Sequence, residues 1–293
     1  MIYRELSAIV RNALAALFVI LLTICIGVRF AAAQTSVAQE ERLEQEFTDP
    51  LTTLPQLLMR DSYSPATYGT HVQTNLALIR PIIPRLPPYS LLPFYQLIRP
   101  TFELVTVPSS RGGSRTEFGD LPIFDVAVLP WPNRKKTGLL IAAGVSFVFP
   151  TATSRSAGQG SWQAGPALGA IYSRIPGLLV GFVLLNPISF AYTSRNRAPQ
   201  NTLEVQPVMA FHLWGEWYLR SAEATWAMGY HRRSATVVPM SLGIGRTFVH
   251  PGLPPMSFFV TGQWTLYRQF APVTPQTTIN FGMTIAFPEL QMW

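Results

Sequence analysis

The chain has little cysteine, little charge and, beyond its first 33 residues, no long apolar run. Its one cysteine, Cys25, lies within that first stretch, so a disulfide framework is excluded. Charged residues make up 13% of the chain, about half the usual share, whereas apolar residues make up 48%. The longest later apolar run, 177–188, is broken by Asn186 and Pro187 and falls short of the roughly 18 residues of a membrane helix.

Residues 1–33 are typical of a secretory signal peptide. Arg4 and Arg11 precede the apolar stretch 13–28, and three alanines stand before Gln34 as a small-residue cleavage site. The alternative is an uncleaved membrane anchor. Cleavage would lower the formal net charge from +7 to +5. Export, together with scattered basic residues, argues against nucleic acid as a partner.

Alternation of apolar with small or polar residues predicts strands along the rest of the chain. From Thr277 to Phe287 the odd positions are apolar or nearly so, and the even positions are Thr, Asn, Gly, Thr and Ala. Successive strand residues face opposite sides, so this segment has one face for lipid and one for a lumen. Strands are expected at residues 71–80, 94–107, 119–131, 138–149, 161–173, 177–191, 201–213, 216–228, 236–249, 256–268 and 276–287.

An exported, apolar chain without a spanning helix is typical of an antiparallel transmembrane β-barrel, because a closed sheet pairs every backbone group. Since single-chain bacterial barrels have an even number of strands, we expect a twelfth strand within residues 54–64. Ten strands remain if 71–80 is not one. The predicted all-β barrel occupies residues 54–293, and the alternative is a soluble periplasmic β-sandwich.

Connection lengths predict the orientation of the barrel. Longer polar connections such as 150–160 alternate with shorter ones such as 214–215. Outer-membrane barrels have long extracellular loops and short periplasmic turns, so both ends of the barrel segment are expected in the periplasm. The Glu-rich segment 34–53 is then a periplasmic or plug-like extension that can include a short helix. The Pro-rich stretch 81–93 is too long for an ordinary periplasmic turn.

Short motifs in a fixed order carry a resemblance to a known family. They are Arg80-Pro-Ile-Ile-Pro84, Gly119-Asp-Leu-Pro-Ile-Phe-Asp125, Phe149-Pro-Thr-Ala-Thr153, Gly160-Ser-Trp-Gln-Ala-Gly-Pro166, Asn186-Pro-Ile-Ser-Phe190, Gln206-Pro207, Trp217-Tyr-Leu219 and Val238-Pro-Met-Ser-Leu-Gly-Ile-Gly245. Over residues 55–288 the chain resembles the bacterial outer-membrane family labelled "MetA-pathway of phenol degradation". The resemblance implies a transporter-like barrel and names no solute. The chain departs from the family at Glu216, which separates Gly215 from Trp217.

Polar residues on the predicted inner faces are candidates for the lining of the lumen. In a barrel of about twelve strands they either fill the interior as a hydrogen-bonded ladder or line a narrow passage. The predicted lining residues are Arg99, Glu103, Asp125, Gln163, Glu204, Gln206, His212, Gln263 and Asn280.

Two further sets of residues are predicted to contact partners. Arginine suits bidentate phosphate contacts, so the predicted outer-loop arginines are candidates for binding lipopolysaccharide in the outer membrane; the alternative is solvated loop charge. The outward apolar face of the last strand, with the C-terminal aromatic residue, resembles the signal that the barrel-assembly machinery recognises. The loop set is Arg155, Arg195, Arg197, Arg232 and Arg233, and the C-terminal set is Phe281, Met283, Ile285, Phe287 and Trp293.

The sequence offers little for catalysis. Glu204 and His212 are eight residues apart on one strand, about 26 Å, and cannot form a pair directly. His231 and Ser234 lack a nearby orienting carboxylate, and no metal or nucleotide motif is present, so no cofactor is expected. We therefore predict an outer-membrane channel for passive passage of small solutes, hydrophobic or aromatic ones included. The alternatives are a plugged structural barrel and a lipid-modifying barrel enzyme.

Overall fold

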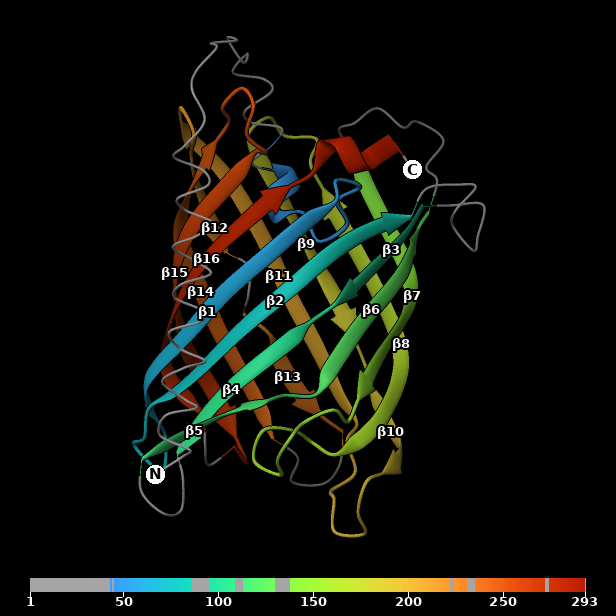
Figure 1. Ribbon diagram of the computed structural model, residues 1–293, viewed down its shortest axis with the longest axis vertical. Helices are drawn as coiled ribbons and strands as arrows, with labels where there is room; N and C mark the ends of the chain where they lie inside the picture. Colours follow the sequence, from blue (N-terminus) through green and yellow to red (C-terminus); the bar gives the residue numbers. More distant parts are fainter. Residues whose placement is uncertain are drawn as a thin grey trace.

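The first and last strands of the chain pair with each other and close the sheet. In this computed structural model β1 (Gln56–Thr67) pairs with β2 (Thr74–Arg85) on one side and with β16 (Pro275–Ala286) on the other, so the sheet forms a barrel (Figure 1). The predicted barrel is thus confirmed and the β-sandwich is wrong. The structure describes residues 43, 45–85, 95–108, 113–129, 138–221, 224–230, 235–271 and 274–292.

The described residues form twelve antiparallel wall strands, as predicted. Four of these are interrupted and appear as pairs of shorter elements: β3 with β4, β5 with β6, β9 with β10, and β12 with β13. The expected twelfth strand is β1, and the strand expected at 71–80 is β2, which begins and ends later along the chain. The other elements are β3 (Tyr95–Pro100), β4 (Phe102–Pro108), β5 (Ser114–Phe118), β6 (Leu121–Val128), β7 (Leu139–Phe149), β8 (Ser161–Tyr172), β9 (Leu178–Leu185), β10 (Ile188–Tyr192), β11 (Thr202–Trp214), β12 (Trp217–Ser221), β13 (Trp226–Gly229), β14 (Thr236–Phe248), β15 (Met256–Gln269) and the short 3₁₀ helix η1 (Pro288–Met292).

The two ends of the barrel differ. We call the end where β1 begins and β16 ends the terminal end; there the amide of Phe287 donates to the carbonyl of Pro55 at 2.8 Å. We call the other end the loop end, which carries the long connections 150–160 and 193–201 (Figure 1). At the terminal end β11 and β12 are joined by Gly215 and Glu216, and Gly215 has a φ of 53°, which a glycine adopts without strain.

The Pro-rich stretch 81–93 is not simply a turn. Its first residues complete β2, where Pro81 lies opposite Leu57 of β1 and Pro84 lies opposite Leu97 of β3. The remainder of this stretch lies outside the described residues. β2 is therefore longer toward the terminal end than alternation alone predicts.

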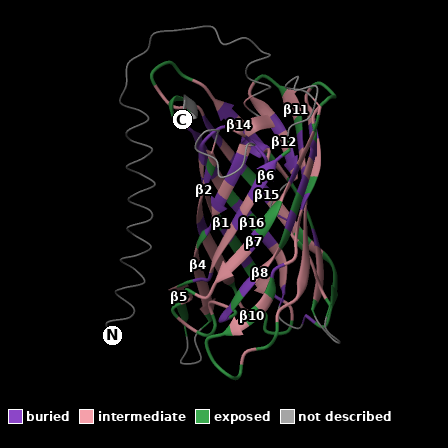
Figure 2. Cartoon of the chain, turned by 90° about the vertical axis from the view of Figure 1, so that its right-hand side faces the viewer, coloured by how far each residue is buried: buried purple, intermediate pink, exposed green. Residues whose placement is uncertain are grey.

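The outer face of the barrel is apolar. On β16, Ile279 and Phe281 are exposed while Thr278 and Asn280 are buried, as the predicted alternation requires. Nearer the terminal end of the strand, Met283 and Ile285 are buried as well. Leu168 of β8 and Phe182 of β9 are likewise exposed, 47% and 42%. The connections at the loop end also contain many exposed residues, drawn in green in Figure 2. Large apolar side chains facing outward on a closed sheet are what a lipid environment requires.

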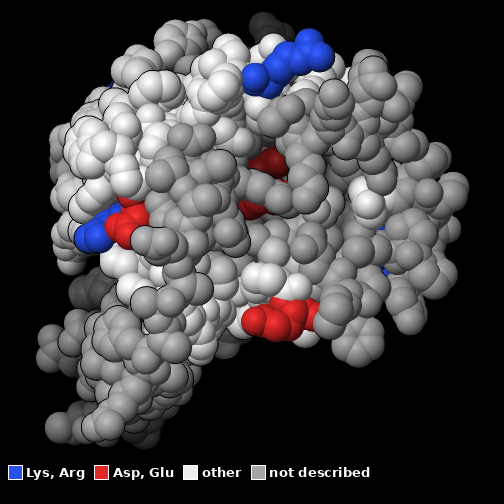
Figure 3. Space-filling view, turned by 90° about the horizontal axis from the view of Figure 1, so that it is seen from above, with Lys and Arg blue, Asp and Glu red and all other residues white. Residues whose placement is uncertain are grey.

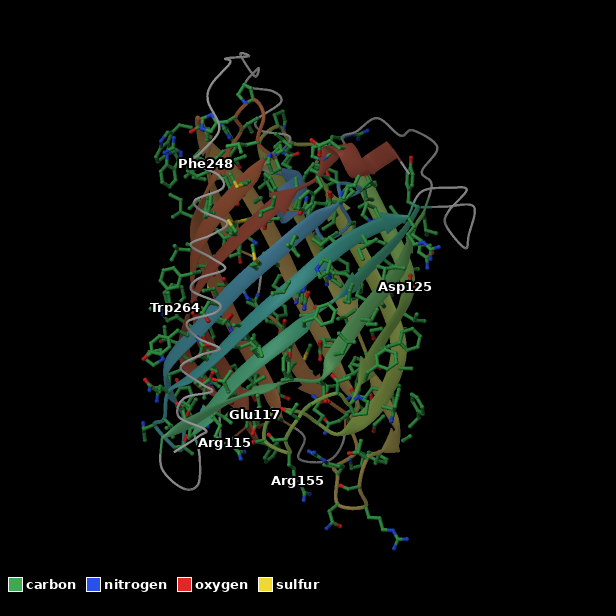
Figure 4. All side chains as sticks on the ribbon, in the orientation of Figure 1. Arg115, Glu117, Asp125, Arg155, Phe248 and Trp264 are labelled. Atoms are coloured by element: carbon green, nitrogen blue, oxygen red, sulfur yellow. The ribbon has the colours of Figure 1, made fainter. Side chains whose placement is uncertain are left out.

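Aromatic residues gather near the strand ends on this outer face. Trp162, at the loop end of β8, makes an edge contact with Phe149 at 5.5 Å between ring centroids. At the terminal end the Arg246 guanidinium lies 5.4 Å from the Trp217 ring and 4.8 Å from that of Phe248 (Figure 4). Aromatic and cationic groups at these heights are typical of the interfaces of a bilayer. Among the described residues, no helix is long and apolar enough to cross a bilayer.

The interior near the terminal end is also apolar. Leu51, which precedes β1, is fully buried and packs with inward side chains of the wall strands, including Val126 of β6, Ile171 of β8 and Val183 of β9. The terminal half of the lumen therefore has a hydrophobic core of its own, and the N-terminal segment supplies its centre.

Candidate solute pathway

The lumen holds a large cavity toward the loop end and a smaller one toward the terminal end. The outer cavity has a volume of about 710 Å³ and the inner cavity about 90 Å³. Residues 47–50 of the N-terminal segment line the inner cavity on the terminal side. Viewed onto the terminal end, the molecule is hollowed near its middle, and acidic side chains are visible at depth (Figure 3).

Arginines separate the two cavities. Arg60 of β1, Arg80 of β2 and Arg99 of β3 line both cavities, and Arg220 of β12 lines the inner one. Their backbones belong to four different wall strands, so the barrel closure brings them together. Four guanidinium groups around one constriction create a strongly positive section of the lumen.

Neighbouring side chains orient these guanidinium groups. The Nε of Arg80 donates to Oγ1 of Thr101 at 2.8 Å. Arg99 lies over the ring of Phe124, with 4.6 Å from its guanidinium carbon to the ring centroid, and Arg220 lies 3.7 Å from the centroid of Phe259. Contacts of a guanidinium with an aromatic face hold it in place without neutralising its charge.

Two glutamates face the outer cavity one step toward the loop end. Glu103 of β4 is close enough to Arg60 and Arg80 for attraction between their charges. Glu204 of β11 lines the same cavity, two residues before Gln206, whose amide donates to Oγ1 of Thr225 at 3.2 Å. The two glutamates thus lie nearer the loop end of the lumen, and the arginines lie nearer the terminal end.

The segment before β1 is fixed inside the barrel by both apolar and polar contacts. Phe47 and Leu54 are buried together with Ala286, next to the core formed around Leu51. The side-chain amide of Gln56 donates to the carbonyl of Glu46 at 2.8 Å, and Glu46 also accepts a hydrogen bond from Thr52. These contacts give the segment one defined position against the wall.

Asp49 makes the docking of this segment sensitive to pH. Burial, and second the charge of Glu46, raise the pKa of Asp49 from 3.8 to about 7, although the Leu51 amide bonded to its carboxylate at 2.8 Å opposes this. Because the docked state favours the neutral acid, docking is strongest below the unfolded pKa and weakens as pH rises toward 7. We expect protease cleavage within 45–53 to be faster at about pH 8 than at about pH 5.

The variant Asp49→Asn tests the source of this pH dependence. It keeps the size of the side chain and removes its titration, so cleavage should become nearly independent of pH. An unchanged pH dependence in this variant would show that another group controls the segment.

The structure places most of the predicted lining residues in the lumen. Arg99, Glu103 and Glu204 line the outer cavity, and so do Gln206, Gln263 and Asn280. Gln163 is buried on the inner face of β8 beside Ser161. His212 shares the inward parity of β11 near the terminal end, beside Gly177.

Asp125 was predicted to face the lumen, and this is wrong. Its neighbours Phe124 and Val126 point inward into the core around Leu51, so Asp125 points outward (Figure 4). There its carboxylate accepts a hydrogen bond from the Gln96 side chain at 2.8 Å. The polar residue faces out because this part of the lumen is itself apolar, which reverses the usual polarity of the two faces.

Three of the four constriction arginines, Arg60, Arg80 and Arg220, are absent from the predicted lining. Alternation carried the signal for Arg60, because Leu57, Met59 and Tyr63 occupy the opposite face of the same strand. For Arg80 the strand was predicted to end at this residue, so its inward position in mid-strand was not evident.

Two of the five predicted loop arginines, Arg155 and Arg197, form hydrogen bonds within the protein. Arg155 donates to the carbonyl of Asn196 at 2.7 Å, and Arg197 donates to the carbonyl of Gly158 at 3.0 Å. These bonds tie the two long loops together at the loop end. Arg195 is exposed, and Arg232 and Arg233 lie outside the described residues.

The members of the predicted C-terminal set differ in exposure, because Met283 and Ile285 are buried. Phe281 is exposed, and Met283 and Ile285 cluster with Phe258 and Phe287 near the terminal end. Trp293 lies outside the described residues. Recognition of this face by the assembly machinery stays a prediction.

The described residues hold no group of three or more His, Cys, Asp or Glu placed to bind a metal ion. His231 and Ser234, considered above as a catalytic pair, both lie outside the described residues. The chemistry that the lumen does show is charge and hydrogen bonding around a cavity. This arrangement suits binding or passage of a solute.

Comparison with solved structures identifies the fold. The COG4313 outer membrane channel from Pseudomonas putida F1 matches with a TM-score of 0.56 and 13% identity, over 82% of this chain and 98% of that one. The chain has the fold of an outer-membrane β-barrel. The KdgM porin also matches, with a TM-score of 0.47 and 8% identity over 79% of this chain and 99% of its own. No family model and no curated protein matches the chain.

Proposed function

We propose that the protein is a bacterial outer-membrane channel through which small solutes pass passively. The observation that carries the proposal is a closed barrel with an apolar outer face and a cavity of about 710 Å³ inside it. A sheet can pair all of its backbone hydrogen-bonding groups in lipid only if it is closed. A cavity inside the closed sheet gives a solute room within the barrel. No cofactor or chemical step is needed.

The terminal end faces the periplasm in this proposal, and the loop end faces outward. The long connections at the loop end and the two-residue turn between β11 and β12 support this orientation. We also propose that the chain is a member of the phenol-degradation family named above. It is supported by the order of the motifs and by the similarity to the Pseudomonas putida channel.

We further propose that the N-terminal segment narrows the passage at its periplasmic end. The burial of Leu51 within the barrel supports this, as does the position of residues 47–50 beneath the arginines. A plugged structural barrel is the second candidate function, favoured by the same packing. Whether solutes pass therefore separates the two.

Membrane location is tested by fractionation and gel migration. The protein should be recovered with outer membranes and should migrate differently before and after heating in detergent, because a closed barrel resists unfolding. A soluble protein with no heat-dependent shift would reject the membrane barrel.

Solute passage is tested by swelling of liposomes that contain the purified protein. We expect small uncharged solutes to enter faster than in liposomes without protein, with rates that fall as solute size increases. Rates equal to those of empty liposomes would favour the plugged structural barrel.

A further inference from the structure

We propose that the arginines between the two cavities bind the carboxylate of a small organic acid with a single charge and an apolar body. This names a solute class for the channel, and its physiological meaning rests on the proposed function. The binding site itself is defined by the constriction and the outer cavity above it.

The charge at the constriction favours an anion. Among the described lining residues of the inner cavity, four are arginines and the acidic residue is Asp49. Three of those arginines also face the outer cavity, where a solute arrives from the loop end. In a lumen with low-dielectric walls such a cluster focuses its field and attracts an anion from the cavity mouth.

Arginine geometry favours a carboxylate in particular. The guanidinium group is planar and matches a carboxylate through two parallel hydrogen bonds. Arg80 is oriented through its Nε bond to Thr101, and Arg99 is oriented by its contact with Phe124, so neither needs to be ordered when a ligand arrives. Preorganised donors lower the entropic cost of binding.

The wall of the outer cavity, on the loop side of the arginines, favours a ligand with an apolar body. Leu76, Val105, Val107, Phe124 and Leu185 line the outer cavity on several strands. A ligand whose carboxylate reaches the arginines would lay its carbon chain or ring against these side chains and remove apolar surface from water.

Glu103 and Glu204 limit the ligand to one charge. Both line the outer cavity on the loop side of the arginines, where the far end of a bound acid would lie. A second carboxylate at that end would meet like charges in a confined space, which is unfavourable. The site thus separates monocarboxylates from dicarboxylates of the same length.

Calorimetric titration of the purified protein in detergent micelles tests the site with three matched probes. Hexanoate has the charge and the apolar chain, hexanol has the chain alone, and adipate has a carboxylate at both ends. Heats are corrected with protein-free micelles. Hexanoate should bind at least about tenfold more tightly than hexanol or adipate, the scale of one charge-assisted hydrogen bond.

The double variant Arg80→Gln with Arg99→Gln should lose at least about tenfold in hexanoate affinity. The control Arg246→Gln, which changes an arginine on the outer face at the terminal end, should bind as the unmodified protein does. Heat-dependent migration confirms that each variant is folded. An interior ladder with a purely structural role would leave hexanoate and hexanol alike in every variant.

The proposal is overturned if the unmodified protein does not bind hexanoate, if hexanol or adipate binds equally well, or if the double variant keeps its affinity. Binding and passage are read separately. If the protein binds hexanoate selectively but liposomes that contain it do not swell, the binding site is supported and the channel function is rejected. Swelling without binding would do the reverse.

Discussion

Deletion of residues 45–53 is expected to raise the single-channel conductance of the protein several-fold. These residues lie inside the terminal half of the barrel, where Leu51 is fully buried against inward side chains of β6, β8 and β9. Their removal would widen the lumen between the arginine constriction and the terminal end, and conductance increases with the open cross-section of a channel. Recordings in planar bilayers compare the deletion with the full chain.

A point variant separates the packing of the segment from its presence. Leu51→Ala removes a buried leucine side chain, which costs about 2–5 kcal/mol in a protein core, and here that cost falls on the docking of the segment. We expect brief openings to the larger conductance level. Equal conductance of the full chain, the deletion and Leu51→Ala would show that the segment does not obstruct the lumen.

Gly243→Val is expected to prevent most of the protein from folding into a barrel. Gly243 faces inward on β14, and a Cβ atom at this position would lie 2.1 Å from the carbonyl oxygen of Val260 and 2.5 Å from Cα of Thr261 on β15. Both contacts are with the backbone of the neighbouring strand, so β14 and β15 could not keep their pairing. The fraction of protein with heat-dependent migration measures the effect.

Gly138→Val is the matched control for this variant. Gly138 precedes β7, and nothing lies within 4 Å of a Cβ built at that position. The control should fold as the unmodified chain does. A Gly243→Val variant that folds equally well would mean that the two strands are not packed as closely as described.

Much of the barrel was predictable because one physical rule repeats along the chain. Residues of the last strand alternate between lipid and lumen, and the same alternation placed Gln163 and Asn280 correctly on inner faces. The even strand count of bacterial barrels then required a twelfth strand, which is β1. These inferences need only the local sequence and the closure of the sheet.

What the sequence did not predict depends on contacts between distant segments. Asp125 was assigned inward because a lumen is usually polar, yet Leu51 makes the adjacent lumen apolar and Phe124 and Val126 take the inward positions. The constriction depends on the register of four strands, which sets Arg60, Arg80, Arg99 and Arg220 around one point. Alternation gives the face of each residue but not its height along the barrel.

Single-channel recording of the purified full-length protein in a planar bilayer distinguishes a narrow channel from a closed barrel. We expect discrete conductance steps that are small in the unmodified protein, because the segment before β1 and the arginine constriction narrow the lumen, and larger after deletion of residues 45–53. A folded, heat-modifiable barrel that gives no conductance steps, with or without these residues, would contradict it.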